Sequence, residues 1–146
     1  MKIDVMQDLK TAQEALDRYV CSLALVRGGQ VLYTSTGKGI APLLNLISER
    51  RDLKGATLSD QVVGLAVAAI AREHGILAVF GKVMSMPARA YLEHEGVIFD
   101  YGTLVESIKT ADGTATCPIE QIAIETPDVP AMIRRIQEFR DRAVRK

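Results

Sequence analysis

The segment from Val62 to Ala71 is the feature that most constrains how this chain can fold. Its ten residues are all apolar or glycine, so a helix formed by them has almost no polar face. Such a helix must be covered on most sides. The pattern predicts a central helix that is capped by Thr57 or Ser59 and ends at Gly75. The segment falls well short of the roughly 20 residues that a membrane span needs.

Two short runs rich in apolar and β-branched residues precede this segment. They are Val20–Val26 and Val31–Ser35, and Arg27-Gly28-Gly29-Gln30 separates them. Adjacent glycines supply the positive φ angles that a tight hairpin requires. We therefore predict an antiparallel pair of strands joined at these glycines.

Helical and strand patterns alternate along the rest of the chain. We expect further helices over about Ile3–Asp17, from Pro42 to Glu49, from Ser85 to Glu95 and from the Cys117 turn, and strands over Ile76–Val83, Val97–Phe99 and Leu104–Ile108. This order predicts an α/β protein, a three-layer α/β/α sandwich with a mixed sheet. The 146 residues are most simply one domain over 1–146, with a helical N-terminal extension over about 1–18 and a C-terminal helix over about 127–143.

Charge and cysteine content exclude several classes of function. Lys plus Arg and Asp plus Glu both number 18, so no net charge draws the chain to nucleic acid or to an anionic membrane, and we expect neither partner. The N-terminus is charged and amphipathic, unlike a secretory signal. With only two cysteines, Cys21 and Cys117, the expected location is the cytoplasm, where thiols stay reduced.

The stretch Thr116-Cys117-Pro118-Ile119-Glu120 has the pattern of a helix start. Proline is favoured at the first helical position, and an acid in the first turn suits the positive end of the helix dipole. Cys117 then occupies the N-cap, where unpaired N–H groups stabilise a thiolate. Three roles stay open for Cys117: a nucleophile, a ligand contact, or a small side chain that only packs or caps. Glu120 joins the candidate ligand-binding residues.

A second candidate binding segment is the loop Thr36-Gly37-Lys38-Gly39-Ile40. The glycines Gly37 and Gly39 let backbone N–H groups approach an anion, and Lys38 adds a positive charge. Short Gly-x-Gly patterns also occur in ordinary loops, and this one lacks the spacing of a P-loop. Lys82, near the end of a predicted strand, either points to the same ligand or is solvated.

Several short motifs occur in the order found in one known family. They are Leu53-Lys54-Gly55-Ala56, Asp60-Gln61-Val62-Val63-Gly64, the helix start at Ser85, and Asp112-Gly113 followed by Cys117-Pro118-Ile119-Glu120. Over about Tyr19 to Ile124 the chain resembles an uncharacterised prokaryotic family, a domain of unknown function whose fold is cytidine deaminase-like. The resemblance therefore implies a deaminase-like scaffold.

Zinc deaminases carry H-x-E or C-x-E at the helix that follows the hairpin, and P-C-x-x-C at the helix that follows the third strand. The predicted helix starts here read Ser59-Asp60-Gln61-Val62 and Ser85-Met86-Pro87-Ala88, and neither has a zinc ligand set. Because the ligand motifs are missing, we expect no metal and no other cofactor, and the resemblance implies a deaminase-like scaffold put to another use. Asp60 and Ser85 would lie at the metal positions. Asp60 is then a general base, a ligand contact or an acid that complements its helix, and Ser85 is a ligand contact or an N-cap.

Three hypotheses for function follow. The first is metal-free binding of a small nucleotide-like or anionic metabolite through Gly37, Lys38, Gly39, Asp60, Ser85 and the Cys117 helix start. The second is an enzyme in which Cys117 is the nucleophile or redox-active thiol and Asp60 the acid or base. The third is a non-catalytic subunit that associates with itself or another protein through an apolar surface, such as part of the last helix.

Overall fold

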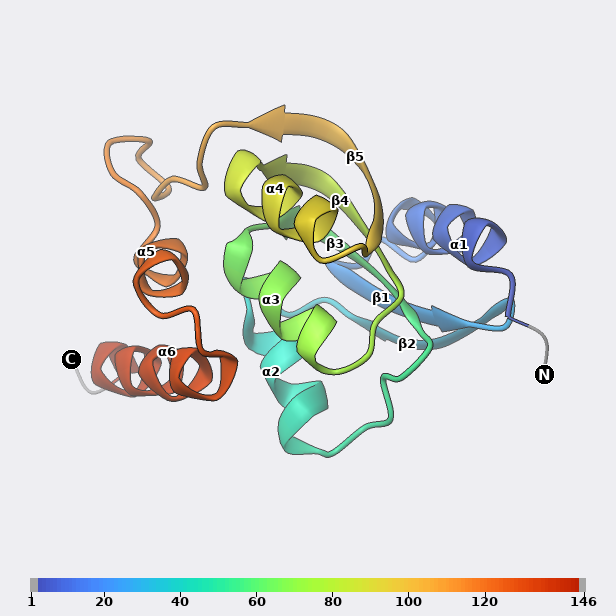
Figure 1. Cartoon of the computed structure of the whole chain (residues 1–146), viewed down its shortest axis with the longest axis horizontal. Coiled ribbons are helices and arrows are strands. Elements are labelled where there is room, and N and C mark those ends of the chain that lie inside the picture. The colour runs from blue at the N-terminus through green and yellow to red at the C-terminus, as the bar shows by residue number, and fades with distance from the viewer. Residues whose placement is uncertain (1–2, 145–146) are drawn as a thin grey trace.

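The computed structural model describes residues 3–144 and contains a five-stranded sheet surrounded by helices (Figure 1). The helices are α1 (Val5–Arg18), α2 (Ala41–Ser48), α3 (Leu65–Glu73), α4 (Met86–His94), α5 (Pro118–Glu125) and α6 (Val129–Val144). The strands are β1 (Leu23–Arg27), β2 (Gln30–Ser35), β3 (Thr57–Val63), β4 (Ala78–Ser85) and β5 (Ile98–Val105). Met1 and Lys2, part of the predicted N-terminal extension, lie outside the described residues.

The strands form a mixed sheet in the order β2-β1-β3-β4-β5. Strand β1 is antiparallel to β2 and to β3, whereas β3, β4 and β5 run parallel to one another. The predicted α/β fold with a mixed sheet is therefore confirmed. In this topology the carboxyl ends of three neighbouring strands lie at one edge of the sheet, which is where α/β proteins commonly bind ligands.

Helices cover both faces of the sheet (Figure 1). Helix α1 covers one face, and its Leu9 and Leu16 pack in a small core with Phe80 of β4. Helices α2, α3 and α4 lie on the other face over a larger core, and α5 and α6 pack outside α3. The apolar helix expected at the centre is α3, whose Ala66–Ala71 are all buried.

The predicted hairpin is confirmed, and an acid on another helix holds it. Gly28 and Gly29 have φ angles of 59° and 80°, as a tight turn between β1 and β2 requires. Their N–H groups donate to the two carboxylate oxygens of Asp8 over 2.9 and 2.8 Å. Because Asp8 belongs to α1 and is buried, it joins the first helix to the hairpin.

The prediction of one long helix beginning near Thr57 is wrong. Thr57–Val63 form strand β3, and the helix begins only at Leu65, after Gly64. Thr57, Ser59 and Asp60 are residue types preferred at helix N-caps, and an apolar run follows them, so the pattern resembles a helix start. Thr57 and Ser59 are consequently strand residues, and Asp60 does not lie at a helix start.

The prediction of two short strands near Gly102 is also wrong. A single strand, β5, runs from Ile98 to Val105 in place of the predicted strands Val97–Phe99 and Leu104–Ile108. A Cβ atom added to Gly102 would lie 2.8 Å from the carbonyl oxygen of Lys82 on β4. The absence of a side chain at Gly102 therefore allows β4 and β5 to lie close together at this position.

Other predicted helix starts hold. Helix α4 begins at Met86, and Ser85 caps it by accepting a hydrogen bond from the Ala88 N–H over 3.2 Å. Helix α5 begins at Pro118 with Cys117 as its N-cap residue, and α6 closely matches the predicted C-terminal helix.

Candidate functional site

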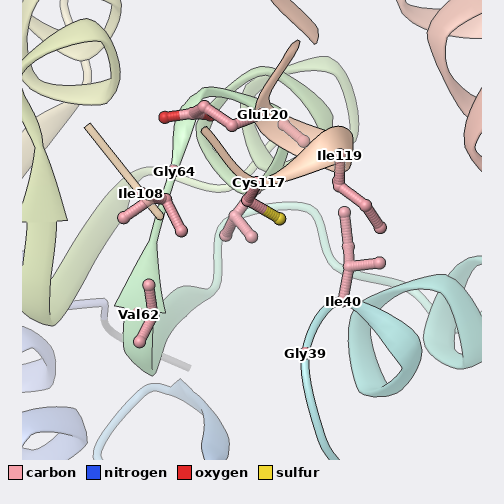
Figure 2. Close-up of a pocket in the computed structure, with 10 residues that line it drawn as sticks. Gly39, Ile40, Val62, Gly64, Ile108, Cys117, Ile119 and Glu120 are labelled. Carbon is pink, nitrogen blue, oxygen red and sulfur yellow. The ribbon is translucent and has the colours of Figure 1, made fainter. Parts of the chain in front are cut away.

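Three helix starts meet around one cavity of about 120 Å³ (Figure 2). The loop before α2, the junction between β3 and α3, and the first turn of α5 form its walls. The residues that line it are Gly39, Ile40, Val62, Gly64, Ala66, Val67, Ile108, Cys117, Ile119 and Glu120. Two of the candidate binding segments, the loop that contains Gly39 and the Cys117 helix start, meet here with the start of α3.

Cys117 contributes a thiol to this cavity. It is the N-cap residue of α5, yet within residues 3–144 its side chain makes no capping hydrogen bond. Figure 2 shows its Sγ atom directed to the side where Ile40 and Ile119 lie. The first N–H groups of any helix have no intrahelical partner. A half-buried thiol and the positive end of α5 therefore both lie at the cavity wall.

Glu120 lies on the first turn of α5 but caps a different helix. Its Oε1 accepts a hydrogen bond from the Leu65 N–H, at the start of α3, over 2.6 Å. Gly64 is the N-cap residue of α3, and a Cβ there would lie 2.8 Å from Glu120 Oε1. The glycine thus gives the Glu120 carboxylate access to the α3 start, where the helix dipole favours a negative charge.

The second oxygen of this carboxylate is the unusual feature. Glu120 is only 2% exposed, and its Oε2 is buried without a hydrogen-bond partner among the described residues. Most buried polar atoms in proteins are paired, so an unpaired carboxylate oxygen beside a cavity requires an explanation. Figure 2 shows Glu120 extending next to Gly64, away from the Cys117 thiol.

Gly39, Cys117 and Glu120 are the sequence-predicted site residues that line the cavity. Lys38 is exposed and immediately precedes Gly39, whereas the Gly37 N–H is bonded to Ser35 Oγ over 3.0 Å. Three of the predicted site residues thus line one cavity, whose other lining residues were not among those predicted.

Ser85 and Lys82 have other partners. The Ser85 hydroxyl is buried and caps α4. The Lys82 ammonium pairs with Asp17 Oδ1 over 3.2 Å, and Asp17 belongs to α1 on the other face of the sheet. Both groups are thus engaged at places other than the cavity.

Asp60 lies inside the sheet, where its strand β3 pairs with Leu23 of β1 and Gly81 of β4. It is 6% exposed, and burial raises the pKa of its carboxyl to about 7 although the backbone N–H groups of Val62 and Gln61 lower it. The cavity that contains Cys117 is lined by residues other than Asp60. Asp60 therefore does not share the cavity with Cys117.

Sequence reasoning missed the apolar walls and Gly64. Ile40, Val62, Ile108 and Ile119 carry no chemical signal, because isolated apolar residues occur throughout a core. Gly64 did carry a signal: a glycine between a β-branched run and an alanine-rich run is a plausible end of a strand and start of a helix.

Residues 3–144 contain no cluster of three or more His, Cys, Asp or Glu side chains that could hold a metal ion. In the same range, no helix combines the length and the apolar character that crossing a membrane requires.

The fold and the cavity together define an α/β protein with a small apolar site at three helix starts. Residues 11–140 match the model of a family described as a domain of unknown function, DUF1893, and the chain belongs to that family. The crystal structure of a DUF1893 family protein from Thermotoga maritima is similar, with a TM-score of 0.81 and 24% identity. The alignment covers 94% of this chain and 92% of that one, which shows a shared fold. No curated protein matches the chain.

Proposed function

We propose that this protein binds a small molecule, without a metal, in the cavity between α2, α3 and α5. The observation that carries the proposal is the half-paired carboxylate of Glu120 on the wall of a cavity that also holds the Cys117 thiol. The cavity volume of about 120 Å³ approaches that of an engineered apolar cavity of about 150 Å³ that binds benzene. One ring-sized group is therefore the expected occupant.

We further propose that the fold is deaminase-like. In this proposal the small molecule binds at the position where zinc deaminases hold their metal ion. In the observed element order, α2 follows the hairpin and α3 follows the third strand. The residues at these helix starts are Gly39-Ile40-Ala41-Pro42 and Gly64-Leu65-Ala66. Because none of them has a side chain that ligates zinc, the chemistry of the position supports binding without zinc.

The cavity volume also limits the size of the group that can enter. A nucleotide-like metabolite, as the sequence suggests, is too large to enter whole, so only its ring fits inside. The exposed Lys38, next to Gly39 on the cavity wall, is suitably charged for an anionic part that stays outside.

A screen of ring-sized fragments by thermal shift tests this proposal, because a ligand that binds only the native state raises the melting temperature. Val62 is 41% exposed on the cavity wall, and Leu32 is 40% exposed on strand β2. Val62→Phe should fill the cavity and remove the shift, whereas Leu32→Phe should leave it unchanged. The proposal is wrong if no fragment stabilises the protein, or if both variants keep the shift.

Cysteine-dependent catalysis is the second candidate function, and the Cys117 thiol at the α5 start favours it. Asp60 lies elsewhere, and Glu120 is engaged with Leu65. The test is the rate of Cys117 alkylation by iodoacetamide at pH 7, with the buried Cys21 as an internal control. This candidate predicts a faster reaction than that of a free thiol, and an equal or slower reaction contradicts it.

A further inference from the structure

The start of α3 carries a negative charge that the chain itself supplies. Helix starts are ordinary binding places for anions, because their N–H groups point outward and the dipole favours negative charge. Here the Glu120 carboxylate, supplied by α5, accepts from the Leu65 N–H over 2.6 Å and is shielded from solvent. An external anion would have to displace it.

The surroundings of the cavity also disfavour a charged occupant of either sign. Glu120 lines the wall, and its Oε2 has no donor within residues 3–144, so its charge is only partly compensated. An anion placed beside this buried carboxylate is repelled. A cation would meet the starts of α2 and α5, neither of which has a capping side chain in the described chain.

We infer that Glu120 fills the anion position of this site and that the part of the ligand entering the cavity is an uncharged, ring-sized group. Its apolar body would contact Ile40, Val62 and Ile119. A neutral acceptor on it, such as a carbonyl oxygen, would face the unpaired N–H groups at the start of α5. This inference rests on the proposed function and specifies its ligand class.

Three probes that share one ring test the inference: benzamide, benzoate and benzylamine, which are neutral, anionic and cationic at pH 7. Titrations of the wild-type protein should show benzamide binding at least about tenfold more tightly than either ion. Glu120→Gln keeps an oxygen for the Leu65 N–H but removes the charge. In this variant benzoate should gain about tenfold, whereas benzamide should change by less than about threefold. Glu106→Gln, at an exposed acid, is the matched control and should leave all three affinities unchanged.

Rescue by a small anion tests the occupied position separately. Glu120→Ala empties the start of α3, so formate should raise the melting temperature of this variant more than that of the wild type. Formamide, which has the same size but no charge, should not. If Glu120→Ala does not fold, the Glu120→Gln titration decides alone.

The outcomes separate the inference from the proposed function. Benzoate binding to the wild type as tightly as benzamide, or an unchanged preference in Glu120→Gln, overturns the inference while binding in the cavity stands. If none of the three probes binds and no fragment stabilises the protein, both are overturned. Tight benzamide binding with the charge-dependent gain of benzoate supports both.

Discussion

Two buried acids, Asp8 and Glu120, connect elements at opposite ends of the molecule, but only Asp8 has both carboxylate oxygens hydrogen-bonded. Each lies on one helix and accepts hydrogen bonds from the backbone of another element. Asp8 uses both oxygens, one for the Gly28 N–H and one for the Gly29 N–H. Glu120 uses only Oε1, for Leu65, and leaves Oε2 unpaired beside a cavity.

The difference indicates which acid is structural and which belongs to a site. A fully paired buried carboxylate repays its desolvation through hydrogen bonds and fixes the elements that it joins. A half-paired one stabilises the fold less and retains an acceptor and a partly compensated charge. We therefore expect Asp8 to matter most for stability and Glu120 to matter most for ligand selection.

Removal of Asp8 should have the largest effect on stability. Asp8→Ala leaves two backbone N–H groups of the hairpin without acceptors, and each charge-assisted bond is worth about 2 kcal/mol, so the expected loss is about 4 kcal/mol. Urea unfolding measures this, and Asp4→Ala, which removes only the exposed cap of α1, is the control. A loss no larger than in the control would show that Asp8 is not a structural clamp.

Asp60 extends the comparison to a buried acid whose hydrogen bond comes from its own strand, from the Val62 N–H over 3.3 Å. Burial raises its pKa from 3.8 to about 7, so the folded state holds the proton more tightly than the unfolded state. Its stabilising contribution is present below pH 3.8 and is lost as the pH rises through about 7. The loss grows across this interval and reaches about 4 kcal/mol above pH 7, since each unit of pKa difference corresponds to about 1.4 kcal/mol.

Asp60→Asn should remove this dependence. Unfolding free energies measured from pH 4 to pH 8 should fall less steeply with pH in Asp60→Asn than in the wild type, and the variant should be the more stable protein at pH 8. Parallel curves for the two proteins would contradict the raised pKa of Asp60.

Glu120 should contribute less to stability than Asp8, because one hydrogen bond is lost instead of two. We expect Glu120→Ala to cost about 2 kcal/mol and Glu120→Gln about 1 kcal/mol, since glutamine keeps an oxygen for the Leu65 N–H. Thermal and urea unfolding provide the measurement. A cost for Glu120→Ala equal to that of Asp8→Ala would erase the distinction between clamp and site.

Cys117 should contribute least. Serine is a preferred N-cap residue, so Cys117→Ser should change the unfolding free energy by no more than about 0.5 kcal/mol. The same variant should lose alkylation by iodoacetamide at this position, as mass spectrometry can show. A loss of stability several times larger would identify the thiol as a packed core group.

Much of the fold could be predicted from local signals. The glycine pair Gly28-Gly29 specifies a hairpin, and Ser85 and Pro118 mark helix starts, because each requirement is met within a few residues of chain. The strand Thr57–Val63 was mistaken for a helix start, since Thr57, Ser59 and Asp60 are preferred N-cap residue types and an apolar run follows them. That single error moved Asp60 from the sheet to an expected helix start.

The site was predictable only in part, for a different reason. Cys117 and Glu120 share one helical turn, so the sequence connects them directly. Glu120 and Leu65 are separated by 55 positions in the chain, and no local sequence pattern predicts such a contact. The apolar walls depend on how α2, α3 and α5 pack, which is a property of the whole fold.

A crystal structure of the protein with benzamide would show directly whether the ring occupies this cavity. We expect the ring between Ile40, Val62 and Ile119, beside Cys117, with the carbonyl oxygen at the start of α5 and Glu120 still bonded to the Leu65 N–H. An empty cavity at a benzamide concentration that saturates binding in solution, with the ring bound at another surface, would contradict it.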